Sequence, residues 1–207
     1  MAASKSGFMK DALILFAITL ISGICLGFVY QVTKGPIEQA TIASNNATYR
    51  QVLSAAEEFT DVEGSQEKIA AMKESGELSG LGFGGVALES VLVGKDASGA
   101  EVGYVINSLS NDSYGGAVKI SVGFDMDGTI TGLGIREIND TPGLGLKAKE
   151  PKFKDQFVGK NAESLTVTKT GASADNEIDA ISGATITSNA VTNAVNAALY
   201  YLHNCME

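Results

Sequence analysis

The sequence predicts an α+β protein, in which a single transmembrane helix and a helical stalk precede a domain of antiparallel sheet with flanking helices. Three observations predict it: an uncharged apolar run, a later series of short alternating segments, and an amphipathic run near the end. We expect a tail over residues 1–11, a transmembrane helix over 12–30, a stalk over 31–60 and the folded domain over 61–207. A chain of 207 residues that is 44% hydrophobic can form one domain with a buried core.

Residues 12–30 read ALILFAITLISGICLGFVY and contain no charge. At about 1.5 Å per residue this run extends roughly 28 Å as a helix, enough to cross a bilayer core. Ile24 precedes Cys25, where a lipoprotein would need a small residue, and no small-x-small cleavage site follows the run, so we expect a retained span. Lys5 and Lys10 precede it, which places the N-terminus in the cytoplasm and the rest of the chain outside.

The stretch after the span has the features of a helical stalk. Pro36 stands where a helix could begin, at a position that needs no N–H donor, and residues 37–59 are mostly helical in pattern. Residues 60–85 are polar and glycine-rich, without a clear period.

Alternation begins at residue 86. Residues 86–93 and 101–109 predict two strands around a turn, and 117–125 and 129–138 predict a second pair. Within 117–125 one face carries large apolar residues: Val118, Ile120, Val122 and Phe124.

The acidic turn between the last two strands could begin a calcium loop. Asp125 and Asp127 precede Gly128, but the later ligands and the closing Glu of an EF-hand are missing, so a hairpin turn is favoured.

The last element is an amphipathic helix over residues 188–203. Its N-cap would be Thr187 or Ser188, and its free N–H groups would stabilise an anion there. A helical stripe of apolar residues marks the buried side: Val191, Val195, Ala198 and Leu202.

Composition excludes several classes of function. A formal charge of −9 argues against nucleic acid binding. Cys25 and Cys205 lack CxxC partners, which argues against a thiolate metal site. His203, the single histidine, is expected on the surface of the last helical turn, which argues against a Ser-His-Asp hydrolase.

Two glycine-containing segments allow more than one interpretation. TPGLG at 141–145 is by itself a sheet-to-helix connection, and DAISGATITS at 179–188 is by itself a capped helix start. The lysines that follow the first segment could meet a phosphate or a neighbouring protein, or form a solvated face: Lys147, Lys149, Lys152 and Lys154.

Together, and in this order, the motifs carry a family resemblance. An N-terminal span followed by SYGGAV at 113–118, DTPGLG at 140–145 and DAISGAT at 179–185 resembles the flavin-binding G subunit of the Rnf complex. That family is related to the C subunit of the sodium-pumping NADH:quinone oxidoreductase, and the compact length favours the Rnf member. The resemblance implies an extracytoplasmic FMN-binding domain anchored in the bacterial inner membrane.

The resemblance also implies a covalent cofactor, with FMN joined through a phosphoester to Thr185 by a separate flavin transferase that uses FAD as donor. Asp179 and Ser182 would be motif residues read by that enzyme, and Thr187 and Ser188 would meet the phosphate. The remaining residues expected around the cofactor come from the motif, the TPGLG loop and its following lysine, and the SYGG segment: Gly183, Ala184, Thr141, Pro142, Gly143, Leu144, Gly145, Lys147, Tyr114, Gly115 and Gly116. The family usually has Glu before TPGLG and often His upstream, whereas this chain has Asp140, which keeps the charge, and Ile138.

We therefore expect an electron-transfer subunit of an ion-translocating ferredoxin:NAD oxidoreductase, which works with other membrane and peripheral subunits, binds no metal and has no independent catalysis. The alternatives are the C subunit of the NADH:quinone complex, a membrane-anchored binding or assembly module, and a hydrolase with Ser182 as nucleophile.

Overall fold

The computed structural model describes residues 5–206, and the side chains within that range except those of 5–7 and 35–43. Residues 1–4 of the expected tail lie outside the described residues. The chain divides into two units, one reaching to Ser44 and one beginning at Asn45.

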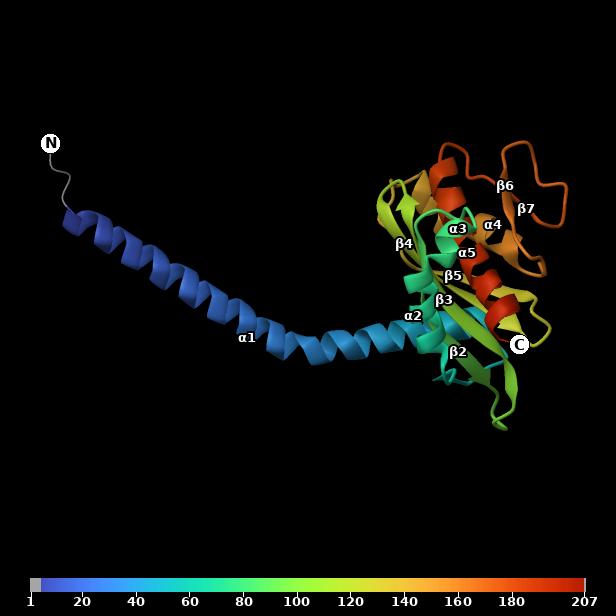
Figure 1. The fold of residues 1–207 in the computed structure, drawn as a ribbon, viewed down its shortest axis with the longest axis horizontal. Helices are drawn as coiled ribbons and strands as arrows, with labels where there is room; N and C mark the ends of the chain where they lie inside the picture. The colour runs from blue at the N-terminus through green and yellow to red at the C-terminus, as the bar shows by residue number, and fades with distance from the viewer. Residues whose placement is uncertain (1–4, 207) are drawn as a thin grey trace. The chain divides into compact units, whose positions relative to one another are not determined.

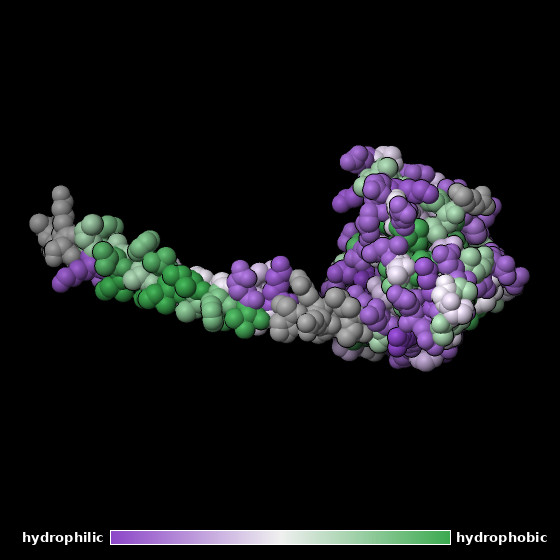
Figure 2. All heavy atoms as spheres, turned by 90° about the horizontal axis from the view of Figure 1, so that it is seen from below, coloured by the Kyte–Doolittle hydropathy of each residue, from purple (hydrophilic) through white to green (hydrophobic). Residues whose placement is uncertain are grey.

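The first helix, α1, runs from Lys5 to Val52. It continues through Pro36, so the helix start expected there is wrong. Its stretch Phe8–Lys34 is long and apolar enough to cross a membrane and includes the expected span. The large apolar side chains of this stretch have no protein cover, which suits a helix surrounded by lipid (Figure 2).

The expectation of a helix up to Phe59 is wrong for its last part. The helix ends at Val52, and strand β1 (Glu58–Asp61) pairs antiparallel with β2 (Val86–Lys95). Tyr49 and Leu53 do bury their side chains in the compact unit. Strand pairing here overrides the local helical pattern, because Phe59 pairs with Gly94 in the register of the sheet.

The four expected strands, together with the unexpected β1, form a five-stranded antiparallel sheet in the order β1-β2-β3-β4-β5; Figure 1 labels β2 to β5. The remaining strands of this sheet are β3 (Glu101–Ser113), β4 (Gly116–Asp125) and β5 (Ile130–Glu137). The stretch without a clear period folds as two short helices, α2 (Ser65–Ser75) and α3 (Glu77–Gly80). Strands β2 to β5 follow one another through short turns, as in a meander, whereas α2 and α3 lie between β1 and β2.

The turn between β4 and β5 is the expected hairpin turn. Asp125 Oδ1 accepts hydrogen bonds from the backbone N–H groups of Asp127 (3.0 Å) and Thr129 (2.8 Å). This carboxylate therefore closes the turn itself, as Asp does in many hairpins.

One face of the sheet packs on the C-terminal helix α5 (Thr185–Cys205), which lies against β3 and β4 (Figure 1). The predicted apolar face of β4 is fully buried there, and the predicted stripe of α5 is buried as well. His203 does lie on the last turn, but it is half-buried rather than on the open surface.

The opposite face is covered by the end of α1 and the residues after it. A Cβ on Gly132 would lie 2.7 Å from Val52 Cα, and Thr131 Oγ1 donates to Val52 O over 2.6 Å. Glycine thus lets backbone lie directly on backbone at this face, which no side chain would allow.

Between β5 and α5 the chain forms short elements and a small second sheet. These are the 3₁₀ helix η1 (Gly145–Lys149), α4 (Pro151–Lys154), the 3₁₀ helix η2 (Asp155–Phe157), and the parallel strands β6 (Thr166–Thr168) and β7 (Glu177–Asp179). They connect the sheet to the start of α5, where the sequence motifs converge.

Candidate functional site

The Ser-Gly-Ala-Thr segment forms a tight turn that leads directly into α5. Ala184 N donates to Ile181 O over 2.9 Å, and Gly183 has φ +77°, a conformation that favours glycine. Helix α5 begins at Thr185, three residues before the predicted start at Ser188. The predicted N-caps are wrong, because Ala184 occupies that position without a side-chain cap.

Ser188 explains why the helix can begin without a side-chain cap. Its Oγ accepts from Ile181 N (2.9 Å) and donates to Ala184 O (3.0 Å), so the hydroxyl holds the turn from inside the helix. The side chain is fully buried. Ser188 is therefore a support of the turn in this structure and does not line the cavity described below.

A buried carboxylate joins this helix start to two distant segments. Asp140 Oδ2 accepts from Thr187 Oγ1 and from Ser113 Oγ, each over 2.6 Å, and its Oδ1 accepts from Gly115 N. Asp140 is 5% exposed, and these three donors stabilise the charge that burial disfavours. The bonds fasten the β3–β4 turn, the TPGLG loop and α5 to one another.

Glycine is required where the loop passes Asp140. A Cβ on Gly145 would lie 2.4–2.7 Å from atoms of the Asp140 side chain, and one on Gly115 would lie 2.3 Å from Asn139 O. Both glycines therefore allow the approach that forms the network.

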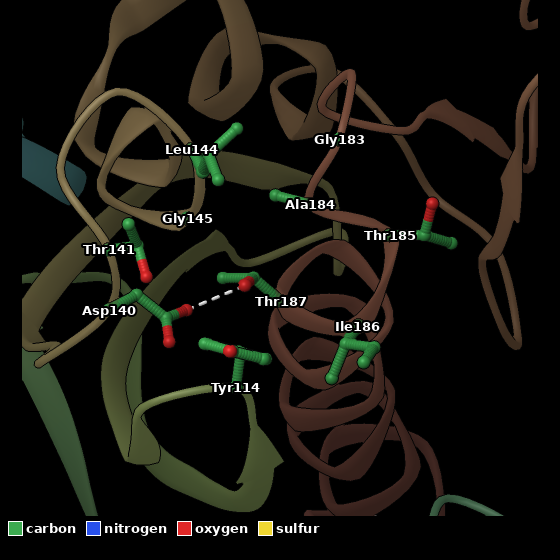
Figure 3. A pocket seen from close by; sticks show the side chains of 10 residues that line it. All are labelled: Tyr114, Asp140, Thr141, Leu144, Gly145, Gly183, Ala184, Thr185, Ile186 and Thr187. Atoms are coloured by element: carbon green, nitrogen blue, oxygen red, sulfur yellow. Dashed lines mark hydrogen bonds between the residues drawn. The ribbon is translucent and has the colours of Figure 1, made fainter.

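These segments enclose a cavity of about 460 Å³ (Figure 3). That volume falls within the range of roughly 300–1,000 Å³ usual for small-molecule sites. The lining residues come from all three segments: Tyr114, Asp140, Thr141, Leu144, Gly145, Gly183, Ala184, Thr185, Ile186 and Thr187.

The rim of the cavity is apolar and open to solvent. Tyr114 is 74% exposed, Ile186 55% and Leu144 43%. Large apolar side chains are seldom gathered at an exposed edge unless a ligand or partner covers them. A flat aromatic ring system could cover this rim.

The helix start offers complementary polar groups. The backbone N–H groups of the first turn of an α-helix have no partner within the helix, and they attract an anion. In Figure 3 the Thr185 side chain points away from Asp140 and Thr187. A phosphate near Thr185 would thus be separated from the buried carboxylate, so the residues fit a group with an aromatic ring and a phosphate, such as FMN.

The predicted site residues divide into distinct groups. The cavity includes Tyr114, Thr141, Leu144, Gly145, Gly183, Ala184, Thr185 and Thr187, whereas Pro142 and Gly143 complete the loop outside its lining. Gly115 binds Asp140, and Gly116 begins β4. Asp179, Ser182 and Lys147 line a second cavity of about 530 Å³.

Two lining residues were not among the predicted site residues. The sequence shows Asp140 where the family usually has Glu, immediately before TPGLG. That position beside the loop is the signal by which its place in the cavity lining could have been predicted. Ile186 follows the motif as an ordinary apolar helix residue, and nothing in the sequence distinguishes it.

Comparison with known proteins agrees with this geometry. The family model described as FMN-binding domain matches residues 113–200, a range that contains all three motif segments. A solved structure of the C subunit of a Na(+)-translocating NADH-quinone reductase from Parabacteroides distasonis has a similar fold, with a TM-score of 0.53 and 24% identity over 79% of this chain and 93% of that one. Fold and site thus define an FMN-binding-domain protein with an apolar N-terminal helix.

Two relatives are similar along nearly their whole length. The G subunit of the Na(+)-translocating ferredoxin:NAD(+) oxidoreductase complex of Acetobacterium woodii is 39% identical, over 94% of this chain and 91% of the relative. The G subunit of the proton-translocating complex of Clostridium ljungdahlii is 33% identical, over 92% of each. The chain belongs to the family of G subunits of ion-translocating ferredoxin:NAD(+) oxidoreductase complexes.

Proposed function

We propose that this chain is the FMN-carrying electron-transfer subunit of a membrane-bound, ion-translocating ferredoxin:NAD oxidoreductase, with FMN joined through its phosphate to Thr185. The observation that most supports this proposal is the position of Thr185. It is the first residue of α5, and it lines the cavity with the apolar rim. FMN, when bound, supplies the electron-transfer chemistry, and the protein supplies its position and surroundings.

Thr185 serves as an attachment point rather than as a catalytic nucleophile. Within the described part of the chain its hydroxyl makes no hydrogen bond to a base, and an unactivated aliphatic hydroxyl is a weak nucleophile. A separate flavin transferase therefore carries out the attachment. Thr185 Oγ1 bonds to the flavin-side phosphorus of FAD, the P–O bond of the diphosphate breaks, AMP leaves, and the hydroxyl proton passes to a base of the transferase.

The start of α5 stabilises the resulting phosphodiester. The aligned peptide dipoles give a helix N-terminus roughly half a positive charge, and the first-turn N–H groups are free to donate. No lysine or arginine is needed on the cavity side, and none is among its lining residues.

The apolar rim binds the ring system. Tyr114, Leu144 and Ile186 come from three segments that Asp140 and Thr187 fasten together, so the rim is arranged before the ligand arrives. Contact with these side chains removes both ring and rim from water, which favours binding.

Membership of the G-subunit family supports an anchoring role for the apolar helix, with the N-terminus in the cytoplasm and the FMN domain outside. Reporter fusions test this orientation. A C-terminal alkaline phosphatase fusion should be active and a C-terminal green fluorescent protein fusion dark; the opposite pattern would reverse the orientation.

The rival hydrolase would need a histidine as its base, and the single histidine of the chain is far from Ser182. Ser182 is exposed at the turn, while His203 lies near the other end of the 21-residue α5, roughly 27 Å away at 1.5 Å per residue. A proton could not pass directly between groups so far apart. The electron-transfer proposal needs no such pair.

Mass spectrometry of protein coexpressed with a flavin transferase tests the attachment. The wild-type peptide that contains Thr185 should gain one FMN-phosphoryl group, Thr185→Ala should gain none, and Thr185→Ser should retain the hydroxyl and the adduct. An adduct on Thr185→Ala would show that the attachment residue is another one.

A further inference from the structure

The attachment motif faces two different cavities. Gly183, Ala184 and Thr185 line the cavity of about 460 Å³, whereas Ile181 and Ser182 line the second cavity of about 530 Å³. The turn between them is the wall that the cavities share. The second cavity, here called the lysine cleft, is lined by Lys147, Glu150, Lys152, Phe153, Gln156, Thr168, Lys169, Asp179, Ala180, Ile181 and Ser182.

The lysine cleft is lined by more lysines than carboxylates: three lysines line it, against Glu150 and Asp179. Lys147, Lys152 and Lys169 are exposed, and no ion pair or hydrogen bond of their ammonium groups occurs among the described residues. Three unpaired lysines gathered around one cleft are unexpected in a chain with a formal charge of −9. Such a cluster attracts a negatively charged partner and accelerates its approach.

The backbone around the cleft is held firmly. Asp179 Oδ1 accepts from Ala172 N over 2.6 Å, which fixes the loop that follows Lys169. Gln156 Oε1 accepts from Asp179 N over 2.7 Å, and Ala180 N donates to Thr168 O over 2.8 Å. Asp179 thus shapes the cleft as well as belonging to the motif.

A neighbouring carboxylate closes the same loop. Hydrogen bonds from the N–H groups of Ser173 and Ala174 and from the Ser173 hydroxyl lower the pKa of Glu177. The loop from 169 to 177 is therefore folded by its own contacts and presents Lys169 at the edge of the cleft.

We propose that the lysine cleft is the docking site for a carboxylate-rich face of the enzyme that transfers the flavin nucleotide to Thr185. This inference rests on the proposed attachment. An enzyme that reads the motif must approach without filling the cavity that the flavin ring will occupy. The lysine cleft meets that condition, because it exposes Ser182 and the lysines on the other side of the shared turn.

Transfer kinetics with purified chain, purified transferase and FAD test the proposal, with the adduct measured by mass spectrometry. Lys152→Glu/Lys169→Glu should raise the KM for the chain about tenfold and leave kcat nearly unchanged, because charges at a docking surface govern encounter. Salt should raise the wild-type KM and have little effect on that of the variant. Lys73→Glu/Lys95→Glu, with the same change in net charge elsewhere on the compact unit, should retain the wild-type KM.

The outcomes separate the two proposals. If Lys152→Glu/Lys169→Glu retains the wild-type KM, or if Lys73→Glu/Lys95→Glu raises it equally, the docking site is wrong while the attachment to Thr185 stands. If kcat falls with KM unchanged, the lysines act on bound FAD or its phosphates and docking is again wrong. If wild-type chain gains no adduct at all, the proposed attachment fails and the docking proposal with it. Thermal melting of all variants verifies that they fold.

Discussion

The compact unit contains two buried polar networks that use similar groups in different ways. At the cavity, the Asp140 carboxylate accepts from Ser113, Gly115 and Thr187. On the sheet face under the end of α1, Asn107 Nδ2 donates to Tyr49 Oη (2.9 Å) and Ser90 Oγ (2.8 Å), and its Oδ1 accepts from Ser121 Oγ (2.6 Å). The first network is charged and borders an open cavity; the second is neutral and covered by protein.

The difference shows what a buried polar group contributes in each place. The Asn107 amide uses both of its functions within the protein, so it holds the end of α1 on the sheet. Asp140 also holds three segments together, but its carboxylate lies in the lining of the cavity. Asp140 therefore joins the segments and also adds a negative charge to the lining of the cavity.

The largest effect is expected from Asp140→Asn. The asparagine amide has nearly the size of the carboxylate. It replaces charged hydrogen bonds with neutral ones, and its NH₂ group faces groups that donate hydrogen bonds to Asp140. We expect unfolding free energy to fall by about 2–3 kcal/mol and FMN incorporation to fall with it. Loss of a negative charge near the flavin should also raise its reduction potential.

Urea unfolding and redox titration of the purified protein measure both consequences. Asp127→Asn, at an exposed turn residue whose carboxylate makes no hydrogen bond among the described residues, should change neither quantity. If the flavin reduction potential of Asp140→Asn equals that of wild type, the role of Asp140 is structural only. The two networks would then not differ in function.

A somewhat smaller effect, confined to stability, is expected from Asn107→Ala. Removing the amide leaves the Tyr49 and Ser121 hydroxyls without these partners, at a cost of about 2 kcal/mol in unfolding free energy. Because the network lies away from the cavity, the flavin potential should remain that of wild type. Asn189→Ala, at an exposed helix position, is the matched control for urea unfolding. A shift in potential as large as that of Asp140→Asn would contradict the separation of the two networks.

The smallest effect is expected from Tyr49→Phe. Only the phenolic oxygen is lost, while Asn107 keeps Ser90 as acceptor, so the unfolding free energy should fall by about 1 kcal/mol. Tyr114→Phe, at a residue 74% exposed on the cavity rim, should leave the stability of the protein without FMN unchanged. Urea unfolding measures the unfolding free energy of both variants. If both lose the same amount, burial of the tyrosine hydroxyl does not determine its contribution to stability.

Much of the architecture could be predicted because it depends on local patterns. The uncharged run, the alternating strands and the stripe of α5 were predictable since each buries one face, or meets lipid, with a fixed period. Strand β1 was missed because Glu58 and Phe59 continue a helical pattern and the next two residues have no clear period, so that only pairing with β2 decides their conformation. Strands β6 and β7 have three residues each, too few for a period to show.

The family and the order of the motifs can be predicted from the sequence, because the Ser-Gly-Ala-Thr segment and the TPGLG loop each consist of contiguous residues. The link through Asp140 between Ser113 and Thr187, which are 74 positions apart, is visible only in the folded chain. The same holds for the support that Ser188 gives to the turn from inside the helix. The division of the motif between the apolar-rimmed cavity and the lysine cleft likewise follows from the fold. Hydrogen bonds and cavities form between segments that packing brings together, and no local period in the sequence indicates which segments will meet.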